Sequence, residues 1–211
     1  MTTTPTQMPI KPPVYVVQDI NFYYVNVTIH MMTINFIHCT FKDTNIYALG
    51  DWISSLSFIN VTWADNAQIT IQSYNKVSFN KCMFLSIRAQ DNTAAIKHKK
   101  KQHWQILENI KIFSLSENYI ISMLNMIFVS FEHCTFRYNK VPKCVLYLRN
   151  VHSAFLLRIN FVLNRVITSG NILSLESITI TKIISGYFLS SIIKYSGRAI
   201  SIKNINMLIV I

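Results

Sequence analysis

The stretch that decides the fold is Phe131-Glu-His-Cys134-Thr-Phe136-Arg-Tyr-Asn139, because its pattern returns along the chain. Clear copies begin at Phe36, Phe58 and Phe79, and weaker copies begin at Leu156 and Ile202. We take the residue at the Cys134 position as the anchor of each copy. The anchors are Val25, Cys39, Val61, Cys82, Ile110, Cys134, Ile159, Ile183 and Ile205, with spacings of 14, 22, 21, 28, 24, 25, 24 and 22 residues. Spacings in this range predict a stacked repeat architecture.

Each position of the pattern keeps one chemical character. The residue three before the anchor is apolar in all nine copies, and the residue just before the anchor is nearly always polar. This alternation predicts short β-strands in which the anchor and the second residue after it point inward. The phase changes between the Phe position and the anchor, which predicts a bend. Asn66, Asn139 and Asn164 lie five residues after their anchors, and we expect corners there because Asn tolerates the left-handed conformation.

The arrangement resembles the right-handed parallel β-helix of the pectin-lyase-like superfamily over about residues 20–211. That resemblance implies an interior of stacked aromatic, aliphatic and Asn side chains, and it alone implies the right-handed sense. The expected fold is all-β, a single solenoid of about eight to nine turns of 21–28 residues. An extended Thr- and Pro-rich segment over residues 1–19 precedes it. A leucine-rich repeat shares the period and is the alternative, although Ile, Phe, Val and Thr dominate here.

The four cysteines are expected to be buried, reduced thiols. Cys39, Cys82 and Cys134 share the inward column, but Val61 and Ile110 lie between them. Each pair is then two turns apart, about 9.6 Å, whereas a disulfide needs Cα atoms within about 7 Å. Only Cys144 is left with a conceivable partner. His38 and His133 each precede a cysteine, but neighbours on a strand point to opposite faces and cannot share a metal ion.

The sequence carries no signature of a catalytic or cofactor site. Nine acidic residues are present, and no two are closer than eight positions. Polysaccharide lyases and glycoside hydrolases on the resembled fold use clustered acids, and Asp43 beside Asp65 is the nearest such pair that stacking could form. P-loop, Rossmann, nucleophile-elbow and zinc spacings are absent. We therefore expect no enzyme activity, no cofactor and no metal. The longest uncharged stretch, residues 20–41, alternates like strands, so no membrane span is expected.

Charge is the one functional signal. The net charge is +11, and residues 1–75 carry −2 while residues 76–211 carry +13. Such asymmetry favours a polyanionic partner, for example an acidic polysaccharide. A basic loop near residues 88–104 and an outward column concentrate the charge. The candidate ligand-binding residues are Lys97, Lys99, Lys100, Lys101, Trp104, Lys81, Arg158 and Lys182.

The apolar C-terminal residues, Asn206 to Ile211, favour end-on assembly with another chain of the same or a different kind. The sequence thus predicts a non-catalytic structural or binding scaffold. Two alternatives stay open: a polysaccharide lyase or glycoside hydrolase on the same fold, and an architectural component of a virion, fibre or other large assembly. The sequence does not name the compartment, and a cell-surface, secreted or assembly-bound location fits equally.

Overall fold

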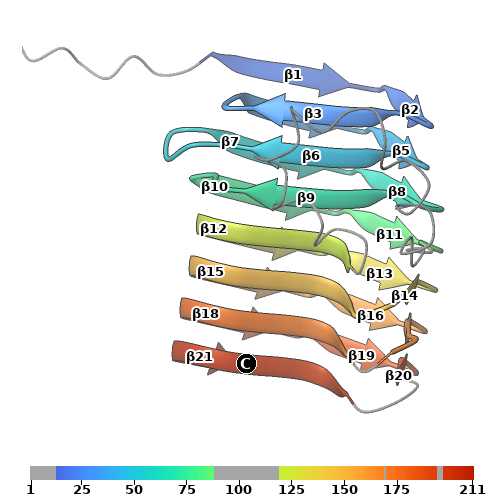
Figure 1. The fold of residues 1–211 in the computed structure, drawn as a ribbon, viewed down its shortest axis with the longest axis vertical. Helices are drawn as coiled ribbons and strands as arrows, with labels where there is room; N and C mark the ends of the chain where they lie inside the picture. The colour runs from blue at the N-terminus through green and yellow to red at the C-terminus, as the bar shows by residue number, and fades with distance from the viewer. Residues whose placement is uncertain (1–12, 88–118, 169, 194–196) are drawn as a thin grey trace, which may run out of the picture.

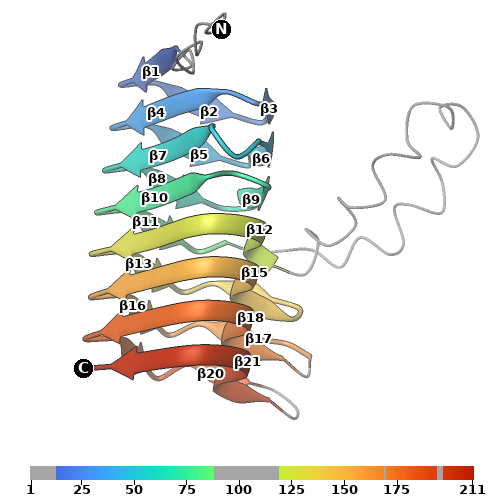
Figure 2. The ribbon, with the colours of Figure 1, turned by 90° about the vertical axis from the view of Figure 1, so that its left-hand side faces the viewer.

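The computed structural model of the chain describes residues 13–87, 119–168, 170–193 and 197–211. In these ranges the chain is all-β and without a helix, and its strands stack in parallel as a β-solenoid of about six turns (Figures 1 and 2). The predicted fold class is therefore confirmed, with fewer turns than the eight to nine expected from the repeats. The described stack also begins earlier than expected, because Val14–Gln18 already pairs with the next turn.

The largest sheet forms two walls of the solenoid. Its main path contains β1 (Val14–Gln18), β4 (Thr33–Ile37), β7 (Ser55–Ile59), β10 (Lys76–Asn80), β12 (Tyr119–Glu132), β15 (Cys144–Leu157), β18 (Asn171–Ile184) and β21 (Arg198–Val210), in that order. The last four strands are long and also cover the second wall. In the earlier turns that second wall is formed by separate strands, β3 (Asn26–His30), β6 (Asn45–Leu49) and β9 (Gln68–Gln72), and β9 pairs with β12.

A third wall is a seven-stranded sheet of three-residue strands, which we call the short sheet. Its strands are β2 (Asn21–Tyr23), β5 (Thr40–Lys42), β8 (Thr62–Ala64), β11 (Met83–Leu85), β13 (Thr135–Arg137), β16 (Asn160–Val162) and β19 (Tyr187–Leu189). The sheet order follows the chain order, so β11 is its central strand. A small third sheet contains β14 (Lys140–Val141), β17 (Arg165–Val166) and β20 (Ile192–Ile193).

Two corners flank every strand of the short sheet, and each places one residue in the left-handed conformation. The first corner precedes the strand, with φ between 49° and 55°, at Asp19, His38, Asn60, Lys81, His133, Arg158 and Ser185. The second corner follows it, with φ between 46° and 58°, at Tyr24, Asp43, Asp65, Ser86, Tyr138, Leu163 and Ser190. The first corner confirms the predicted bend. None of these residues is glycine, so each corner costs roughly 1 kcal/mol that the stack must offset.

The corner at Leu163 gives a stability prediction. Leu163 is exposed and has a φ of 53°, a conformation that Asn adopts at lower cost than Leu. We expect Leu163→Asn to raise the free energy of unfolding by about 0.5–1 kcal/mol in urea denaturation. Leu189→Asn is the matched control, because Leu189 is similarly exposed but lies in a strand. Equal changes in the two variants would contradict the corner explanation.

Two stacks of aromatic rings fill the core at the predicted inward positions. The first stack is Phe36, Phe58, Phe79 and Phe131, with centroid distances of 5.2, 4.7 and 4.6 Å. The second stack is Phe22, Phe41, Trp63, Phe84, Phe136, Phe161 and Phe188, with centroid distances between 4.3 and 5.6 Å. Edge contacts such as Phe58–Trp63 at 5.3 Å join the stacks. Repeating the same residue in register thus builds a continuous core.

The predicted asparagine corners are wrong by one residue. The left-handed residues are Asp65, Tyr138 and Leu163, each directly before the expected asparagine. Because a left-handed residue reverses the alternation, Asn139 and Asn164 turn inward and are 1% exposed. Asn139 Nδ2 donates to Asn164 Oδ1 at 2.8 Å, so the two form a short buried asparagine stack. Asn66 sits in a turn with one extra residue and hydrogen-bonds at the surface instead.

The strand register corrects three predicted anchors, Val25, Ile183 and Ile205. Phe161 pairs with Phe188, so the anchor of the last short strand is Gly186 and not Ile183. Ile183 instead pairs with Leu156 at the Phe position. Ile205 lies inside β21 and pairs with Ile178. At the other end Phe22 pairs with Phe41, which makes Ile20 the first anchor in place of Val25.

The register also changes the geometry of the cysteine column. β11 pairs directly with β13, so Cys82 and Cys134 lie in adjacent turns and not two turns apart. The predicted anchor between them, Ile110, lies outside the described residues. At a strand spacing of about 4.8 Å the separation argument against a Cys82–Cys134 disulfide is wrong. All four cysteines are nevertheless free and buried, as predicted.

Burial makes the four thiols chemically inert in the folded chain. Loss of hydration raises the pKa of the Cys82 thiol, and the neighbouring Cys134 raises it further; burial likewise raises the pKa of Cys144. Since the thiolate is the reactive form and burial shields all four sulfur atoms from the reagent, we expect none of the four to react with a thiol-specific chromogen at pH 8 within minutes, and all four to react in denaturant. Rapid reaction of any one in the folded protein would contradict this.

Within the described residues, no helix has the length and apolar character needed to cross a membrane.

Candidate functional site

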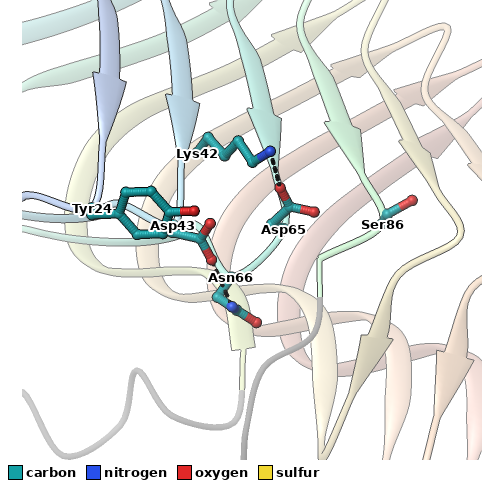
Figure 3. Close-up of a pocket in the computed structure, with 6 residues that line it drawn as sticks. All are labelled: Tyr24, Lys42, Asp43, Asp65, Asn66 and Ser86. Carbon is teal, nitrogen blue, oxygen red and sulfur yellow. Dashed lines mark hydrogen bonds and ion pairs between the residues drawn. The ribbon is translucent and has the colours of Figure 1, made fainter.

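A surface pocket of about 400 Å³ lies along the second corner of the early turns (Figure 3). Its lining residues are Tyr24, Lys42, Asp43, Asp65, Asn66 and Ser86. Four of these are second-corner residues of successive turns, and their left-handed conformation aims each side chain away from the core. The pocket is therefore built by stacking one corner position in register.

Two polar contacts between neighbouring turns organise the pocket. Lys42 Nζ lies 3.2 Å from Asp65 Oδ2, and Asn66 Nδ2 donates to Asp43 Oδ1 at 2.6 Å. The hydrogen bond to Asp65, followed by the charge of Asp65, raises the pKa of Lys42. Lys42 therefore stays an ammonium group at neutral pH.

The stacking brings Asp43 and Asp65 into one pocket, as the sequence allowed. Their surroundings differ from those of a catalytic acid pair. Asp65 is 44% exposed and paired with an ammonium group, whereas a general acid needs burial or a second unpaired carboxylate. The remaining carboxylate oxygen atoms of the pocket are able to accept hydrogen bonds from hydroxyl or amine groups of a ligand, and Tyr24, 78% exposed, offers a ring face. The arrangement suits polar binding better than acid–base chemistry.

Basic side chains occupy the first corner of three consecutive turns. These residues, Lys81, His133 and Arg158, are called the basic corner. Each backbone N–H donates to a carbonyl of the next turn, at 2.9, 2.9 and 2.8 Å, so the hydrogen-bond ladder continues through the bend. The three side chains are exposed, at a spacing of about 4.8 Å per turn. Among the described residues, none of the three takes part in an ion pair.

The other predicted binding residues do not join this column. Lys182 lies in β18, three residues before the corner, where it pairs with Phe155 on the wall of the long strands. Ser185, and not Lys182, occupies the first-corner position of this turn. Lys97, Lys99, Lys100, Lys101 and Trp104 lie outside the described residues.

Only Asp43 and Asp65 of the pocket residues were predicted from the sequence to lie side by side. Tyr24, Lys42, Asn66 and Ser86 were missed, although all four second-corner residues of the pocket lie four residues after the correct anchors. Ser86 shares this offset with Asp43 and Asp65, whereas Tyr24 has it only when the first anchor is Ile20 and not Val25. The described ranges contain no group of three or more His, Cys, Asp or Glu side chains able to hold a metal ion.

Comparison with protein-family models finds no match, and a search of curated proteins finds none either.

Proposed function

We propose that the protein is a non-catalytic β-solenoid scaffold whose basic corner binds an acidic polysaccharide or another polyanion. The observation that carries the proposal is the register of Lys81, His133 and Arg158, which aligns the positive charges of Lys81 and Arg158 with an imidazole between them, without an ion-pairing partner among the described residues. A polyanion carries charge at a regular spacing, so a regular cationic column offers it several contacts at once. The net charge of +11 adds long-range attraction.

Binding of heparin and of polygalacturonate, titrated across salt concentrations, tests this proposal. Lys81→Ala/Arg158→Ala is expected to lower the affinity about ten-fold and to reduce the slope of log affinity against log salt by up to about 2, because two ionic contacts are lost. Lys76→Ala/Lys203→Ala removes the same charge from exposed positions outside the basic corner and serves as the control. Equal losses in both double variants would assign the binding to net charge alone and would overturn the basic corner.

The lysines predicted from sequence need their own variant. Replacing Lys97, Lys99, Lys100 and Lys101 by Ala tests whether that segment contributes to the same binding. If this variant abolishes binding while Lys81→Ala/Arg158→Ala does not change it, the polyanion site belongs to residues 97–101 and not to the corner.

We also infer that the scaffold belongs with the pectin-lyase-like right-handed β-helices. The stacked phenylalanines and the buried Asn139–Asn164 pair support this placement, because such stacks are what the resemblance implies.

A polysaccharide lyase or hydrolase is the second candidate, because Asp43 and Asp65 line one pocket. Product formation from polygalacturonate, followed by absorbance and by reducing ends in the same titrations, would support it. Loss of that product in Asp65→Asn would assign the chemistry to the pocket. Absence of product with intact binding would support the scaffold.

We further propose that the scaffold assembles end-on, as part of a fibre, virion or other large structure. Met207, Leu208 and Val210 on the last strand are 54%, 43% and 67% exposed, and an unpaired strand edge is a template for further pairing. Light scattering that rises with concentration, and that is lost in Leu208→Lys/Val210→Lys, would support this assembly. A monomer at all concentrations would contradict it.

A further inference from the structure

The outer face of the short sheet carries more apolar side chains than a solvated sheet face requires. Seven of its outward and second-corner residues are large, apolar or aromatic, and 42–78% exposed: Tyr23, Tyr24, Met83, Tyr138, Leu163, Tyr187 and Leu189. When one face of a β-sheet is exposed to solvent, the residues on that face are normally polar. Tyr, Met and Arg are the residue types enriched in protein interfaces, and Arg137 stacks 4.5 Å over the ring of Tyr138 here.

Charge on this face changes sign at its central strand, β11. On the side of β2, β5 and β8 the corners carry Asp19, Asp43 and Asp65, and Lys42 is the one amine. On the side of β13, β16 and β19 the strands and corners carry Arg137 and Arg158, and Lys140 and Arg165 follow in β14 and β17 of the small third sheet. No carboxylate lies in those three strands or in the described corners beside them. The face is therefore mainly acidic at one end and basic at the other, and its central strand carries one charged corner residue, Lys81.

We propose that two copies of the chain pair through the short sheet, face to face and with their solenoid axes antiparallel. The two-fold axis lies in the plane of the interface, along β11. Under this symmetry β11 faces its own copy, β8 faces β13, β5 faces β16 and β2 faces β19. Asp65 then lies across from β13 beside Arg137, and Asp43 lies across from the corner that leads from β16 to Arg165, with every contact made twice. Lys81, at the first corner of β11, lies across from its own copy at one edge of the interface.

The choice of a second copy as the partner follows from the charge pattern. A face that reverses its charge about its middle is complementary to itself when inverted, whereas a polyanion is attracted to only one half. The six spacings of about 4.8 Å between the seven strands and a width of about 15 Å give about 430 Å² on each copy. The total of about 900 Å² is at the low end for specific interfaces, so we expect a reversible dimer of micromolar affinity.

Sedimentation velocity with charge-reversed variants tests the pairing. The background is Leu208→Lys/Val210→Lys, which removes end-on association through β21. In it, Asp43→Arg/Asp65→Arg is expected to weaken dimerisation at least ten-fold, because arginine then meets the basic half of the partner copy. Arg137→Asp/Arg165→Asp is expected to weaken it as much, because aspartate then meets the half of the partner copy that carries Asp43 and Asp65. Mixing the two variants restores the dimer, since each supplies the charge that the other lacks.

Cysteine cross-linking tests the register, because the native thiols are buried. Leu85→Cys, on the axis, is expected to form a disulfide-linked dimer under mild oxidation by oxidised glutathione, which accepts the two electrons and two protons. Leu189→Cys, in the same column but far from the axis, cross-links with itself at least ten-fold more slowly and cross-links with Tyr23→Cys when the two are mixed. Circular dichroism checks that every variant folds.

Several results would overturn the proposal. A monomer at all concentrations up to about ten times the expected micromolar range would do so. So would a dimer that survives both charge reversals, or equal cross-linking of Leu85→Cys and Leu189→Cys. Polyanion binding through Lys81 and Arg158 is measured separately, so failure of the dimer and failure of the scaffold function are distinguishable.

Discussion

Replacement of Phe79 by alanine is expected to lower the free energy of unfolding by about 3–5 kcal/mol. Phe79 is fully buried, and its ring lies 4.7 Å from Phe58 and 4.6 Å from Phe131 in the first aromatic stack. The centroid of its ring also lies 5.7 Å from the ring centroid of Trp63. A cavity at this point removes ring contacts on both sides, and the neighbouring turns cannot collapse because the backbone ladder holds their spacing.

Urea denaturation followed by circular dichroism measures this loss. Phe79→Leu keeps most of the volume and is expected to cost less than half as much as Phe79→Ala. Tyr24→Ala removes an exposed ring of similar size and is expected to change stability by less than about 0.5 kcal/mol. If Phe79→Ala cost no more than Tyr24→Ala, the stacked core would be wrong.

Replacement of Asn139 by alanine is the second large effect, with an expected loss of about 2–4 kcal/mol. Its side chain satisfies three buried groups: the N–H of Ile87 at 2.9 Å, the carbonyl of Phe84 at 3.0 Å and Oδ1 of Asn164 at 2.8 Å. Alanine leaves the N–H of Ile87 without this acceptor and the carbonyl of Phe84 without this donor in a region closed to water, while Asn164 Oδ1 keeps only the backbone N–H of residue 139 at 3.2 Å. Asn139→Leu restores volume but no hydrogen bond, so it is not expected to recover the loss.

Asn66→Ala is the matched control, because Asn66 has the same offset from its anchor and makes a surface hydrogen bond to Asp43. A loss of less than about 0.5 kcal/mol is expected there. Equal losses at Asn66 and Asn139, measured by the same urea denaturation, would contradict the buried role of Asn139.

The strand register could be predicted from the sequence where one residue type recurs at one position of the repeat. It could not be predicted where several neighbouring apolar residues fit the same position equally well. Phe58, Phe79 and Phe131 align unambiguously, because each is followed by Val or Cys three residues later and by an aromatic residue five residues later. Between Ile172 and Ile211 isoleucine occupies so many positions that Ile183 fits an anchor as well as Gly186 does, and the true anchor has no side chain to mark it.

The number of turns was overestimated for a different reason. Phe84 pairs with Phe136 across 52 residues, so neighbouring turns of the described stack are joined by more residues than one repeat contains. Closing a longer connection adds little entropic cost, so its length need not change the stack. Counting residues therefore cannot separate a long connection from an additional turn, and the expected anchor Ile110 falls in this interval.

The candidate sites depended on the same register. Lys81 and Arg158 were placed correctly in one column because Cys82 and Ile159 are true anchors. Lys182 was misplaced with its anchor, Ile183. Tyr24 and Lys42 could not be assigned to the pocket, since their roles depend on a left-handed residue that reverses the inward–outward alternation.

The left-handed corners have a consequence for how such a protein can evolve. Their side chains leave the core, so Asp, His, Lys, Tyr, Leu and Ser all occupy them without altering the aromatic stacks inside. Each of the two corners thus forms a row of side chains along the stack, with one variable position per turn at the strand spacing of about 4.8 Å. Selection can change the chemistry of such a row one turn at a time while the interior stays constant, so related chains with the same fold can differ completely in what they bind.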